Sequence, residues 1–584
     1  MISLMLAIRL SFLVALLVAV VHAIAAYGSD AALLVAARNL LWWQCASALA
    51  GALIAASTWP FLRKRAQWVA LAISPTLIVG LEISAWLVAG NFHHSLGSVL
   101  RLLAFGGAFL LPAALLFAFT RRPLQLRWMT PLQIALLVAA LLLQWTISPK
   151  ADEPGDRPDL ALIVIDAVQV RALGHMGAPL EPSPRLDALA RTGWTSDAGF
   201  SAAATSIPGH AAILFGLDVL QHRAPTNDFD LPQDLPLSLA GRLREQGYTT
   251  MGFCQNPLVS SRSGFARGFD VWWNWGEQAW LNQPAPVAML QWPAAYLWSR
   301  ASHGDRVTLT ARAALPSARG PLFTFIQLLY THHPYVDGDG WATAQRIAEI
   351  EALIEAGAIS NRTSYAANEV ASLYAAYLGS VAYSDRLVGE MVDLLSSRAG
   401  ERGLVIVVTA DHGENLAEHG DEAIAEHYGP WSTTLRVPLI VHDTRVSTKG
   451  VRGQSLSSNQ HIARLLLHAA DGLLPLEAED WALRVGEELA LDPAFIYSEP
   501  WLVLVDDSLK VAIDRTDLAA APIAHRWRED FEDRQDLSGL PIIEQRWQEL
   551  LELHQKMGEA GILDAPASID PEKLEHLRTL GYID

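Results

Sequence analysis

Residues 404–420 read LVIVVTADHGENLAEHG, and this stretch decides the fold. Its first part, Leu404–Val408, is an apolar run without alternation, which predicts a strand buried on both faces of a sheet. Asp411 and His412 stand where that strand stops, and Gly413 is expected to let the backbone turn sharply. In an open α/β sheet, ligands bind beyond the carboxyl ends of the strands. An isolated Asp-His pair is more often a helix cap and a packed ring, so the other strand ends must decide whether it holds a metal.

Two further apolar runs end in polar residues that suit the same edge. Residues 160–165 (LALIVI) are followed by Asp166, and residues 323–330 (FTFIQLLY) are followed by Thr331-His332-His333. The remaining expected elements are strands at 248–253 and 437–441 and helices at 184–192, 237–246 and 368–396. Strands that alternate with helices predict a mostly parallel sheet with helices on both faces.

Residues 204–217, ATSIPGHAAILFGL, predict a helix whose first turn holds Pro208 and which stops at Gly216. Ser206 would lie at its amino end, where backbone N–H groups and the helix dipole favour an anion. A serine beside a metal, attacking a phosphate or sulfate group, suits such a position. A plain helix cap is the commoner use of Ser or Thr there, and Thr205 is the rival nucleophile.

The charge of the chain is divided unevenly. Residues 1–150 have ten Lys or Arg and two acids, a balance of +8 against −18 for the whole chain, which leaves −26 for residues 151–584. An acidic surface argues against a nucleic-acid partner, because phosphate backbones are held by basic patches. An anionic substrate would therefore need a local cation, such as a metal. With two cysteines in 584 residues, no disulfide framework is predicted.

Five apolar stretches near the ~20 residues that a helix needs to cross a bilayer predict a multi-span transmembrane domain over residues 1–149. They cover residues 2–25, 39–61, 67–90, 97–119 and 130–148. Basic loops follow the second and fourth stretches, so the positive-inside rule predicts a cytoplasmic amino terminus and an external location after Lys150. The first stretch could instead be a signal peptide. We expect a multi-pass protein of a bacterial-type inner (cytoplasmic) membrane, with the lipid bilayer as a partner and the catalytic domain extracytoplasmic.

Seven short motifs occur in order along the rest of the chain. They are Ile165-Asp166, SIPGH at 206–210, HHPY at 332–335, DHGE at 411–414, HYG at 427–429, LRVPLI at 435–440 and LRTLGYI at 577–583. Together they resemble the sulfatase-like branch of the alkaline phosphatase superfamily, and ordered matches are more specific than any one motif. Five spans before such a domain are similar to the layout of phosphoethanolamine transferases and lipoteichoic acid synthases.

The resemblance implies an alkaline-phosphatase-like α/β fold for the part of the chain after the membrane domain. Residues 150–158 would be the linker, residues 159–496 the catalytic domain, and residues 497–584 a small C-terminal α+β subdomain.

The resemblance also implies one divalent metal. Its ligands would be Asp166, Ser206, Asp411 and His412, with Ser206 at the nucleophile position. This set of Asp, Asp, His and a hydroxyl suits Zn²⁺ or Mn²⁺ better than Ca²⁺. Residues 414–420 are then expected to be a connecting loop without ligands.

Three histidines gain roles from the same resemblance. His332 and His427 fall at catalytic positions that bind substrate oxygens, protonate the leaving group or hold a second metal. His210, at a substrate-binding position, replaces the arginine of the sulfatase signature Cys/Ser-x-Pro-Ser-Arg. Gly209 breaks that signature a second time, which disfavours conversion of Ser206 to formylglycine.

These observations predict a membrane-bound, metal-dependent hydrolase or transferase of phosphoester or sulfoester groups, acting through Ser206. Its substrate would be a phosphorylated or sulfated lipid or glycan outside the cytoplasm. Two alternatives stay open, a sulfatase with a modified Ser206 and a non-catalytic lipid-binding or regulatory membrane protein. The sequence leaves open whether the ester is a phosphate or a sulfate, and whether water or an alcohol accepts the group.

Overall fold

The computed structural model describes residues 157–274, 303–315, 318, 320–491 and 493–562. The chain divides into two units, residues 1–152 and 153–584, and the described residues all belong to the second. The five expected membrane stretches and the motif at 577–583 lie outside the described residues. Within the described ranges, no helix combines the length and the apolar character that crossing a membrane requires.

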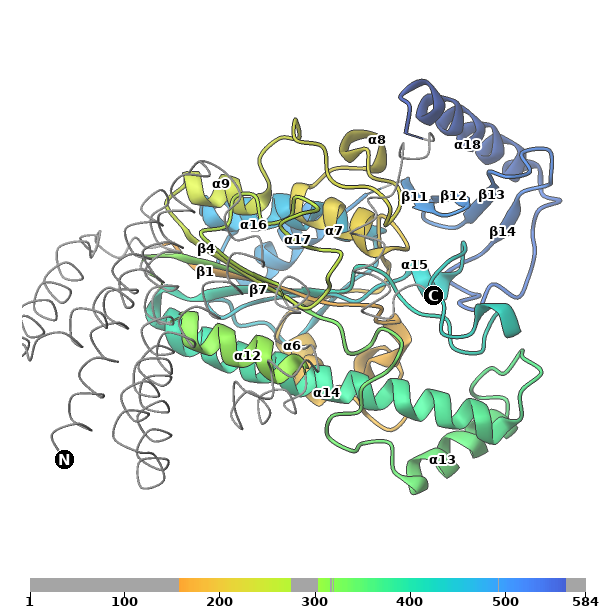
Figure 1. The fold of residues 1–584 in the computed structure, drawn as a ribbon, viewed down its shortest axis with the longest axis horizontal. Helices are drawn as coiled ribbons and strands as arrows, with labels where there is room; N and C mark the ends of the chain where they lie inside the picture. The colour runs from red at the N-terminus through yellow and green to blue at the C-terminus, as the bar shows by residue number, and fades with distance from the viewer. Residues whose placement is uncertain (1–156, 275–302, 316–317, 319, 492, 563–584) are drawn as a thin grey trace, which may run out of the picture. The chain divides into compact units, whose positions relative to one another are not determined.

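A central sheet of eight strands forms the middle of the predicted catalytic domain (Figure 1). Its strands are β1 (Asp159–Ile165), β2 (Trp194–Ser196), β4 (Thr249–Cys254), β5 (Val271–Asn274), β6 (Leu322–Leu328), β7 (Leu404–Thr409), β8 (Leu439–Asp443) and β9 (Val451–Gly453). They lie in the order β5-β4-β6-β1-β7-β8-β2-β9. The five strands from β5 to β7 are parallel, whereas β8 runs antiparallel to both β7 and β2.

Burial on both faces of the sheet explains why the sequences of the three middle strands do not alternate between apolar and polar residues. Every residue of β1, β6 and β7 is buried, because helices cover both faces of the sheet. The register pairs Ile165 with Leu328 and Val164 with Thr409. The carboxyl ends of the three strands therefore meet at one edge, as the sequence predicts.

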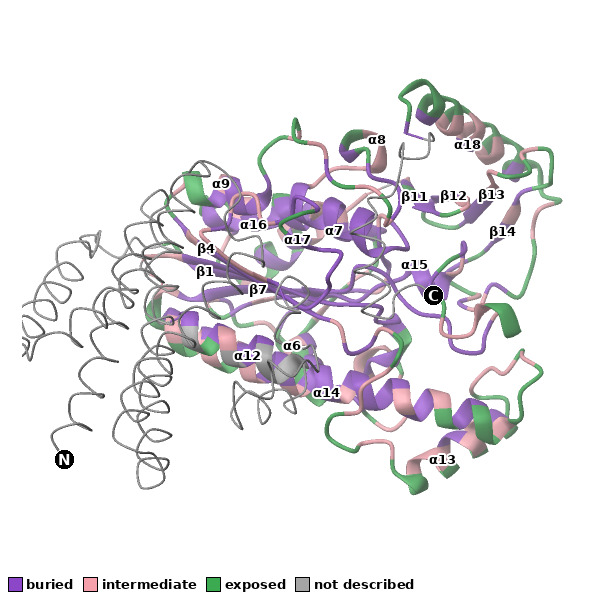
Figure 2. Cartoon of the chain, viewed as in Figure 1, coloured by how far each residue is buried: buried purple, intermediate pink, exposed green. Residues whose placement is uncertain are grey.

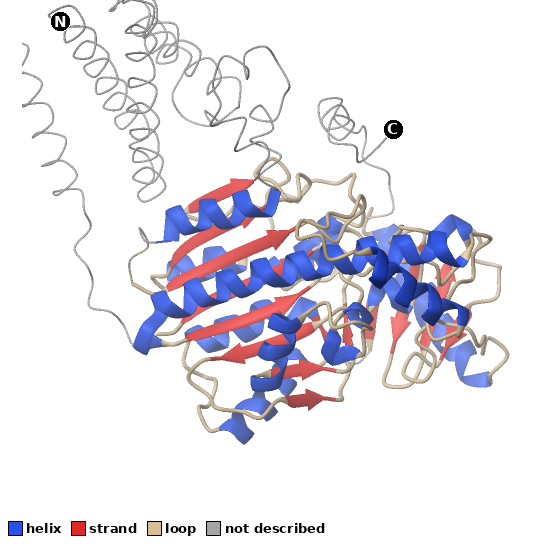
Figure 3. Ribbon diagram, turned by 90° about the horizontal axis from the view of Figure 1, so that it is seen from below, coloured by secondary structure: helices blue, strands red, loops and turns tan. Residues whose placement is uncertain are grey.

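Helices form a layer on each face of the sheet (Figure 1, Figure 3). One layer contains α6 (Pro184–Thr192), α12 (His303–Ala314) and α14 (Ala367–Ala399), with α13 (Ala344–Glu355) packed on α14. The other contains α7 (Ser206–Phe215), α9 (Leu239–Glu245), α16 (Ile462–Ala470) and α17 (Ala478–Leu489). Buried residues follow the sheet and the helix faces turned toward it (Figure 2). The predicted α/β fold is thus confirmed for this part of the chain.

A second, smaller sheet follows at the C-terminal end. It is antiparallel and consists of β11 (Ala494–Ser498), β12 (Trp501–Val505), β13 (Lys510–Asp514) and β14 (Ile523–His525). Helix α18 (Pro541–Glu559) packs on this sheet through an apolar cluster that includes Leu504, Val511 and Leu550. The remaining elements are the strand pair β3 (Gly199–Phe200) and β10 (Ser457–Ser458) and the short helices α8 (Val219–His222) and α15 (Ser432–Leu435).

A buried ion pair between Lys510 and Asp533 connects the small sheet to Ser432, the first residue of α15. Lys510 of β13 donates hydrogen bonds to Asp533 at 2.6 Å and to the hydroxyl of Ser432 at 3.0 Å. The backbone N–H of Ser432 donates to the same carboxylate at 2.7 Å. Nearby, the Ser498 hydroxyl donates to the carbonyl of Gly429 at 2.6 Å. The small sheet therefore holds the segment that directly follows His427.

Replacing Lys510 with methionine is expected to lower the free energy of unfolding by about 3–5 kcal/mol, because Asp533 would remain buried without its cation. Unfolding of the protein in denaturant, followed for wild type and variant, measures this change. Lys556→Met is the matched control, since Lys556 is exposed on α18 and should change stability by no more than about 0.5 kcal/mol. Equal effects of the two substitutions would show that the Lys510 ion pair does not stabilise the fold.

Candidate active site

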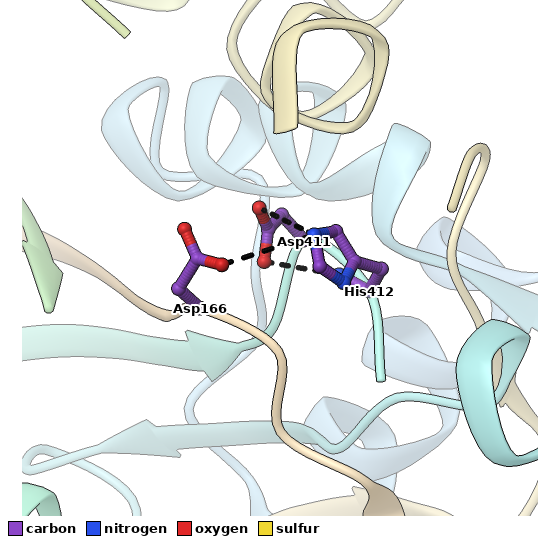
Figure 4. A group of neighbouring side chains, drawn as sticks. All are labelled: Asp166, Asp411 and His412. Atoms are coloured by element: carbon purple, nitrogen blue, oxygen red, sulfur yellow. Dashed lines mark hydrogen bonds and ion pairs between the residues drawn. The ribbon is translucent and has the colours of Figure 1, made fainter. Parts of the chain in front are cut away.

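Three predicted ligands meet at the edge of the central sheet (Figure 4). Asp166 follows β1 directly, and Asp411 and His412 follow β7 after a single residue. One ligand atom from each of the three lies within 4.8 Å of the others, and all three side chains are fully buried. This is the only group of three such ligands found in the described part of the chain.

The ligand atoms of this group have no hydrogen-bond partners among the described residues. They are Oδ1 of Asp166, Oδ2 of Asp411 and Nε2 of His412. Nδ1 of His412 lies 2.9 Å from the carbonyl oxygen of Gly413, which can only accept, so Nδ1 carries the proton and Nε2 keeps its lone pair. Nε2 lies 3.5 Å from Oδ2 of Asp411 and 3.8 Å from Oδ1 of Asp166. Buried oxygen and imidazole atoms left without partners suit a divalent cation.

Burial of two carboxylates side by side disfavours their charged forms. Desolvation, with the Asp411 charge as the next cause, raises the pKa of Asp166 to about 6. Desolvation raises the pKa of Asp411 to about 7. The pKa of His412 is lowered, chiefly by burial, so the ring stays neutral. A cation between these groups would reverse the cost of holding both carboxylates ionised.

Ser206 begins helix α7, as the sequence predicts, and it is buried. The helix ends at Gly216, whose backbone has a φ of 70°. The first turn approaches the metal-ligand segment closely, because a Cβ on Gly209 would lie 2.9 Å from the Asp411 carbonyl oxygen. Glycine at this position of the motif therefore has a packing reason.

Gly413 has a different purpose from the expected sharp turn. The φ of Gly413 lies outside the left-handed region, so its backbone conformation does not require glycine. Instead, a Cβ at Gly413 would lie 2.1 Å from the carbonyl oxygen of Thr433, and its backbone N–H donates to Thr434 at 2.7 Å. Close approach of two backbone segments, rather than turn geometry, requires glycine here.

His210 is fully buried one turn into α7. Its Nδ1 lies 2.8 Å from the Ser206 carbonyl oxygen and 3.4 Å from Oδ2 of Asp411. The ring meets Phe265 and Phe325 edge to face, and burial lowers the pKa of His210 to about 3. His210 therefore lies beside the ligand group as a neutral ring.

His332 and His427 come together next to His412. The ring of His427 stacks on that of His412 at 4.4 Å and 24°, and the ring of His332 lies 5.2 Å from that of His427. His427 is buried, and desolvation holds its pKa well below the usual range. His332 is half-buried, whereas the neighbouring His333 is exposed and packs against Tyr335. Both predicted histidines thus line the group, with His332 nearer to solvent.

Two buried amides of this site have no counterpart among the residues that the sequence singled out. Asn256, in the loop after β4, and Gln327, in β6, each donate a hydrogen bond to Oδ2 of Asp166 at 2.8 Å. Asn256 also donates to the Ser206 hydroxyl at 3.0 Å. The one available signal was the glutamine within a mostly apolar strand. Asn256 lies in a loop that gave no signal.

Glu414 lies in a loop and outside the ligand group, as the sequence predicts, but its burial was not expected. It is fully buried, and both of its carboxylate oxygens lack hydrogen-bond partners within the described ranges. Desolvation, followed by the charge of Asp166, holds the pKa of Glu414 well above its usual range. It does not belong to the three-residue ligand group.

The chain is similar to known proteins in sequence and in fold. The sulfatase family model matches residues 158–472. The ulvan-active sulfatase of Formosa agariphila is 23% identical over 363 residues, which are 59% of this chain and 69% of that protein. A phosphonate monoester hydrolase from Silicibacter pomeroyi is similar in fold, with a TM-score of 0.50, 17% identity, and coverage of 71% of this chain and 98% of the other.

A further similar structure was solved in complex with its substrate, D-glucosamine-2-N,6-O-disulfate. It has a TM-score of 0.50 and 16% identity, and the match covers 70% of this chain and 99% of that one. Because the family model covers more than half of the sequence, this chain belongs to the sulfatase family and is a hydrolase of sulfate or phosphate esters within the alkaline phosphatase superfamily.

Proposed function

We propose that this protein is a metal-dependent enzyme that transfers a phosphoryl or sulfuryl group from its ester through Ser206. The observation that carries the proposal is the set of three buried ligand atoms without partners, on Asp166, Asp411 and His412. Ser206 shares the Asn256 amide nitrogen with Asp166, so its hydroxyl adjoins the same set. A non-catalytic protein has no need for converging ligands beside a serine.

Enzymes of the sulfatase family bind a divalent metal, and the donors present here fit one. Two carboxylates, one neutral imidazole and a serine hydroxyl favour Zn²⁺ or Mn²⁺ over Ca²⁺, which prefers oxygen ligands alone. Asp166, Ser206, Asp411 and His412 would hold it. When bound, such a cation lowers the pKa of a coordinated hydroxyl and neutralises charge on the transferred group. A second cation would need His332 or His427.

The protein side chains carry out the other steps of the proposed reaction. Oγ of Ser206 forms a bond to phosphorus or sulfur as the bond to the leaving oxygen breaks, and its proton passes to solvent. His332, which is half-buried beside the ligand group, supplies a proton to the leaving oxygen. His427 and His210, both neutral, contact the oxygens of the transferred group. Water or an acceptor alcohol then attacks the covalent adduct and gives its proton to His332, and the departing Ser206 oxygen regains a proton from solvent.

Metal affinity is expected to rise by about 10²- to 10³-fold from about pH 5 to about pH 8. The reason is that the carboxyls of Asp166 and Asp411, with pKa values raised to about 6 and about 7, must lose their protons to bind a cation. Calorimetric titration with Mn²⁺ or Zn²⁺, together with the number of protons released, measures this dependence. An affinity that stays constant over this range would contradict the assignment of the two carboxylates.

For the substrate, we propose a phosphorylated or sulfated lipid or glycan. Two relatives support a sulfated glycan, since one is named ulvan-active and another was solved with a disulfated glucosamine. The likeness to a phosphonate monoester hydrolase agrees with a phosphorus ester. Turnover of a chromogenic phosphodiester, phosphomonoester and sulfate ester, with bound metal measured in parallel, tests the proposal. The proposal fails if none of the three esters is turned over in a metal-dependent way.

A sulfatase that acts through formylglycine is the second candidate, because relatives of this chain are named sulfatases. It requires oxidation of Ser206 within a signature that Gly209 and His210 break. Mass spectrometry of the peptide that contains Ser206 separates the two mechanisms. An aldehyde at position 206 in active protein would favour the modified form.

We further propose that residues 1–149 anchor the enzyme in the inner membrane of a bacterial-type cell, with the catalytic domain outside the cytoplasm. The five apolar stretches and the two basic loops between them support this topology. A reporter enzyme that works only in the periplasm, fused after residue 155, is expected to be active. An inactive reporter, with an active cytoplasmic reporter at the same point, would contradict it.

A further inference from the structure

A single buried amide joins the proposed nucleophile to a proposed metal ligand. Nδ2 of Asn256 lies 3.0 Å from Oγ of Ser206 and 2.8 Å from Oδ2 of Asp166. Asn256 is fully buried, and its position lies fifty residues after the serine in the sequence. An amide nitrogen has two hydrogens, so it can satisfy both oxygens at once.

The orientation of this amide is fixed by its other end. Oδ1 of Asn256 accepts a hydrogen bond from the backbone N–H of Leu258 at 2.9 Å, so the NH₂ group must face Ser206 and Asp166. The backbone N–H of Asn256 donates in turn to Oε1 of Gln327 at 2.7 Å. This contact leaves Nε2 of Gln327 as the donor to Asp166, at 2.8 Å.

The two carboxylate oxygens of Asp166 differ in their hydrogen bonds. Oδ2 accepts two N–H groups, from Asn256 and Gln327, whereas Oδ1 has no partner in the described part of the chain and faces His412. The amides therefore present one oxygen of Asp166 to a cation. Outer hydrogen bonds of this kind hold metal ligands in position.

The contact with Ser206 has a separate chemical effect. A hydrogen bond donated to Oγ stabilises the serine oxygen more as it gains negative charge, because bonds to charged acceptors are stronger than bonds to neutral ones. Oγ is most negative when it attacks the ester and when it departs from the covalent adduct. A fixed N–H at this point acts as an oxyanion donor does in other enzymes.

We infer that Asn256 is a catalytic residue that donates to the reacting oxygen of Ser206, and that Gln327 is a positioning residue that acts through Asp166. The inference rests on the proposed role of Ser206 as nucleophile. A purely structural role for Asn256, supporting Asp166 alone, is the alternative. The two differ in what happens when metal is saturating.

The experiment compares Asn256→Leu with Gln327→Met in the full-length protein. Each variant removes one N–H donor to Asp166, and only Asn256→Leu removes the donor to Ser206. In Gln327→Met, the N–H of Gln255 still donates to the backbone carbonyl of residue 327, which keeps the loop attached. Thermal unfolding checks the folding of both, and Asn256→Ala replaces the leucine variant if leucine is not accommodated.

Both variants are expected to bind Mn²⁺ about 10- to 100-fold more weakly in a direct titration. At saturating Mn²⁺, Gln327→Met should recover most of its kcat. Asn256→Leu should remain about 10²- to 10³-fold below wild type in kcat with little change in KM. With a chromogenic ester that has a good leaving group, the covalent adduct on Ser206 should also accumulate in Asn256→Leu, because the departing oxygen has lost its donor.

Recovery of Asn256→Leu at saturating metal would overturn the inference and leave Asn256 as a support for Asp166. An equal kcat loss in Gln327→Met at saturating metal would also overturn it, because the site as a whole would then have been disturbed. Ser206→Ala separates this failure from that of the proposed function. If Ser206→Ala keeps its activity, the nucleophile assignment fails; if it is inactive while Asn256→Leu is normal, only the role of Asn256 fails.

Discussion

Replacing Ser206 with alanine is expected to lower kcat by about 10⁴-fold or more, because the covalent step loses its attacking oxygen. The fold should survive, since alanine fits the space of serine at the start of α7 and the hydroxyl accepts one hydrogen bond there. Hydrolysis of chromogenic esters at saturating metal measures the loss. Titration with Mn²⁺ should show that the variant still binds metal through Asp166, Asp411 and His412.

The neighbouring Thr205 offers a matched control. It is also buried, lies one residue before Ser206, and its side chain makes no capping hydrogen bond to α7. Thr205→Val should therefore retain activity within a fewfold of wild type. Loss of activity in Thr205→Val with retention in Ser206→Ala would transfer the nucleophile to Thr205.

Replacing Asp411 with asparagine is expected to weaken metal binding by more than about 100-fold, the upper range for outer-sphere partners, since Asp411 is proposed to contact the metal itself. Activity should fall with it. The same change should stabilise the metal-free protein at about pH 8. The folded-state pKa of Asp411 is raised to about 7, so its contribution to stability is present below the unfolded pKa of 3.8 and is lost as pH rises through about 7.

Asp385 of α14 is the control for this prediction. Its carboxylate is also buried, its pKa is raised to about 6, and it accepts hydrogen bonds from the backbone N–H groups of Arg185 and Leu186 at 3.0 and 2.7 Å. Asp385→Asn should leave metal affinity unchanged, because the residue is outside the ligand group. Equal metal affinities of Asp411→Asn and wild type, measured by calorimetry, would contradict the site.

The elements that deliver the ligands could be predicted from the sequence. Burial on both faces gives β1 and β7 unbroken apolar runs, residues 160–165 and 404–408, so Asp166 and Asp411 after them stand out. Helix α7 was equally clear, because Ser206, Pro208 and Gly216 mark its start and its end. The meeting of these residues followed from the rule that parallel strands end at one edge.

The supporting residues could not be predicted, because their partners are distant in sequence. Asn256 is ninety positions from Asp166, and no local pattern shows that a loop amide will reach a carboxylate so far away. Gln327 was visible as a polar residue in a mostly apolar strand, but the residue that it contacts could not be predicted. The burial of Glu414 depends on segments that pack around it rather than on its own neighbours. The transmembrane domain stays a prediction, since residues 1–149 lie outside the described part.

Mass spectrometry of the peptide containing Ser206, taken from active enzyme quenched during turnover of a phosphoester, tests the central claim most directly. The account predicts an unoxidised serine at position 206, part of which carries the transferred phosphoryl group. Formylglycine at position 206, or a covalent group on another residue of the active enzyme, would contradict it.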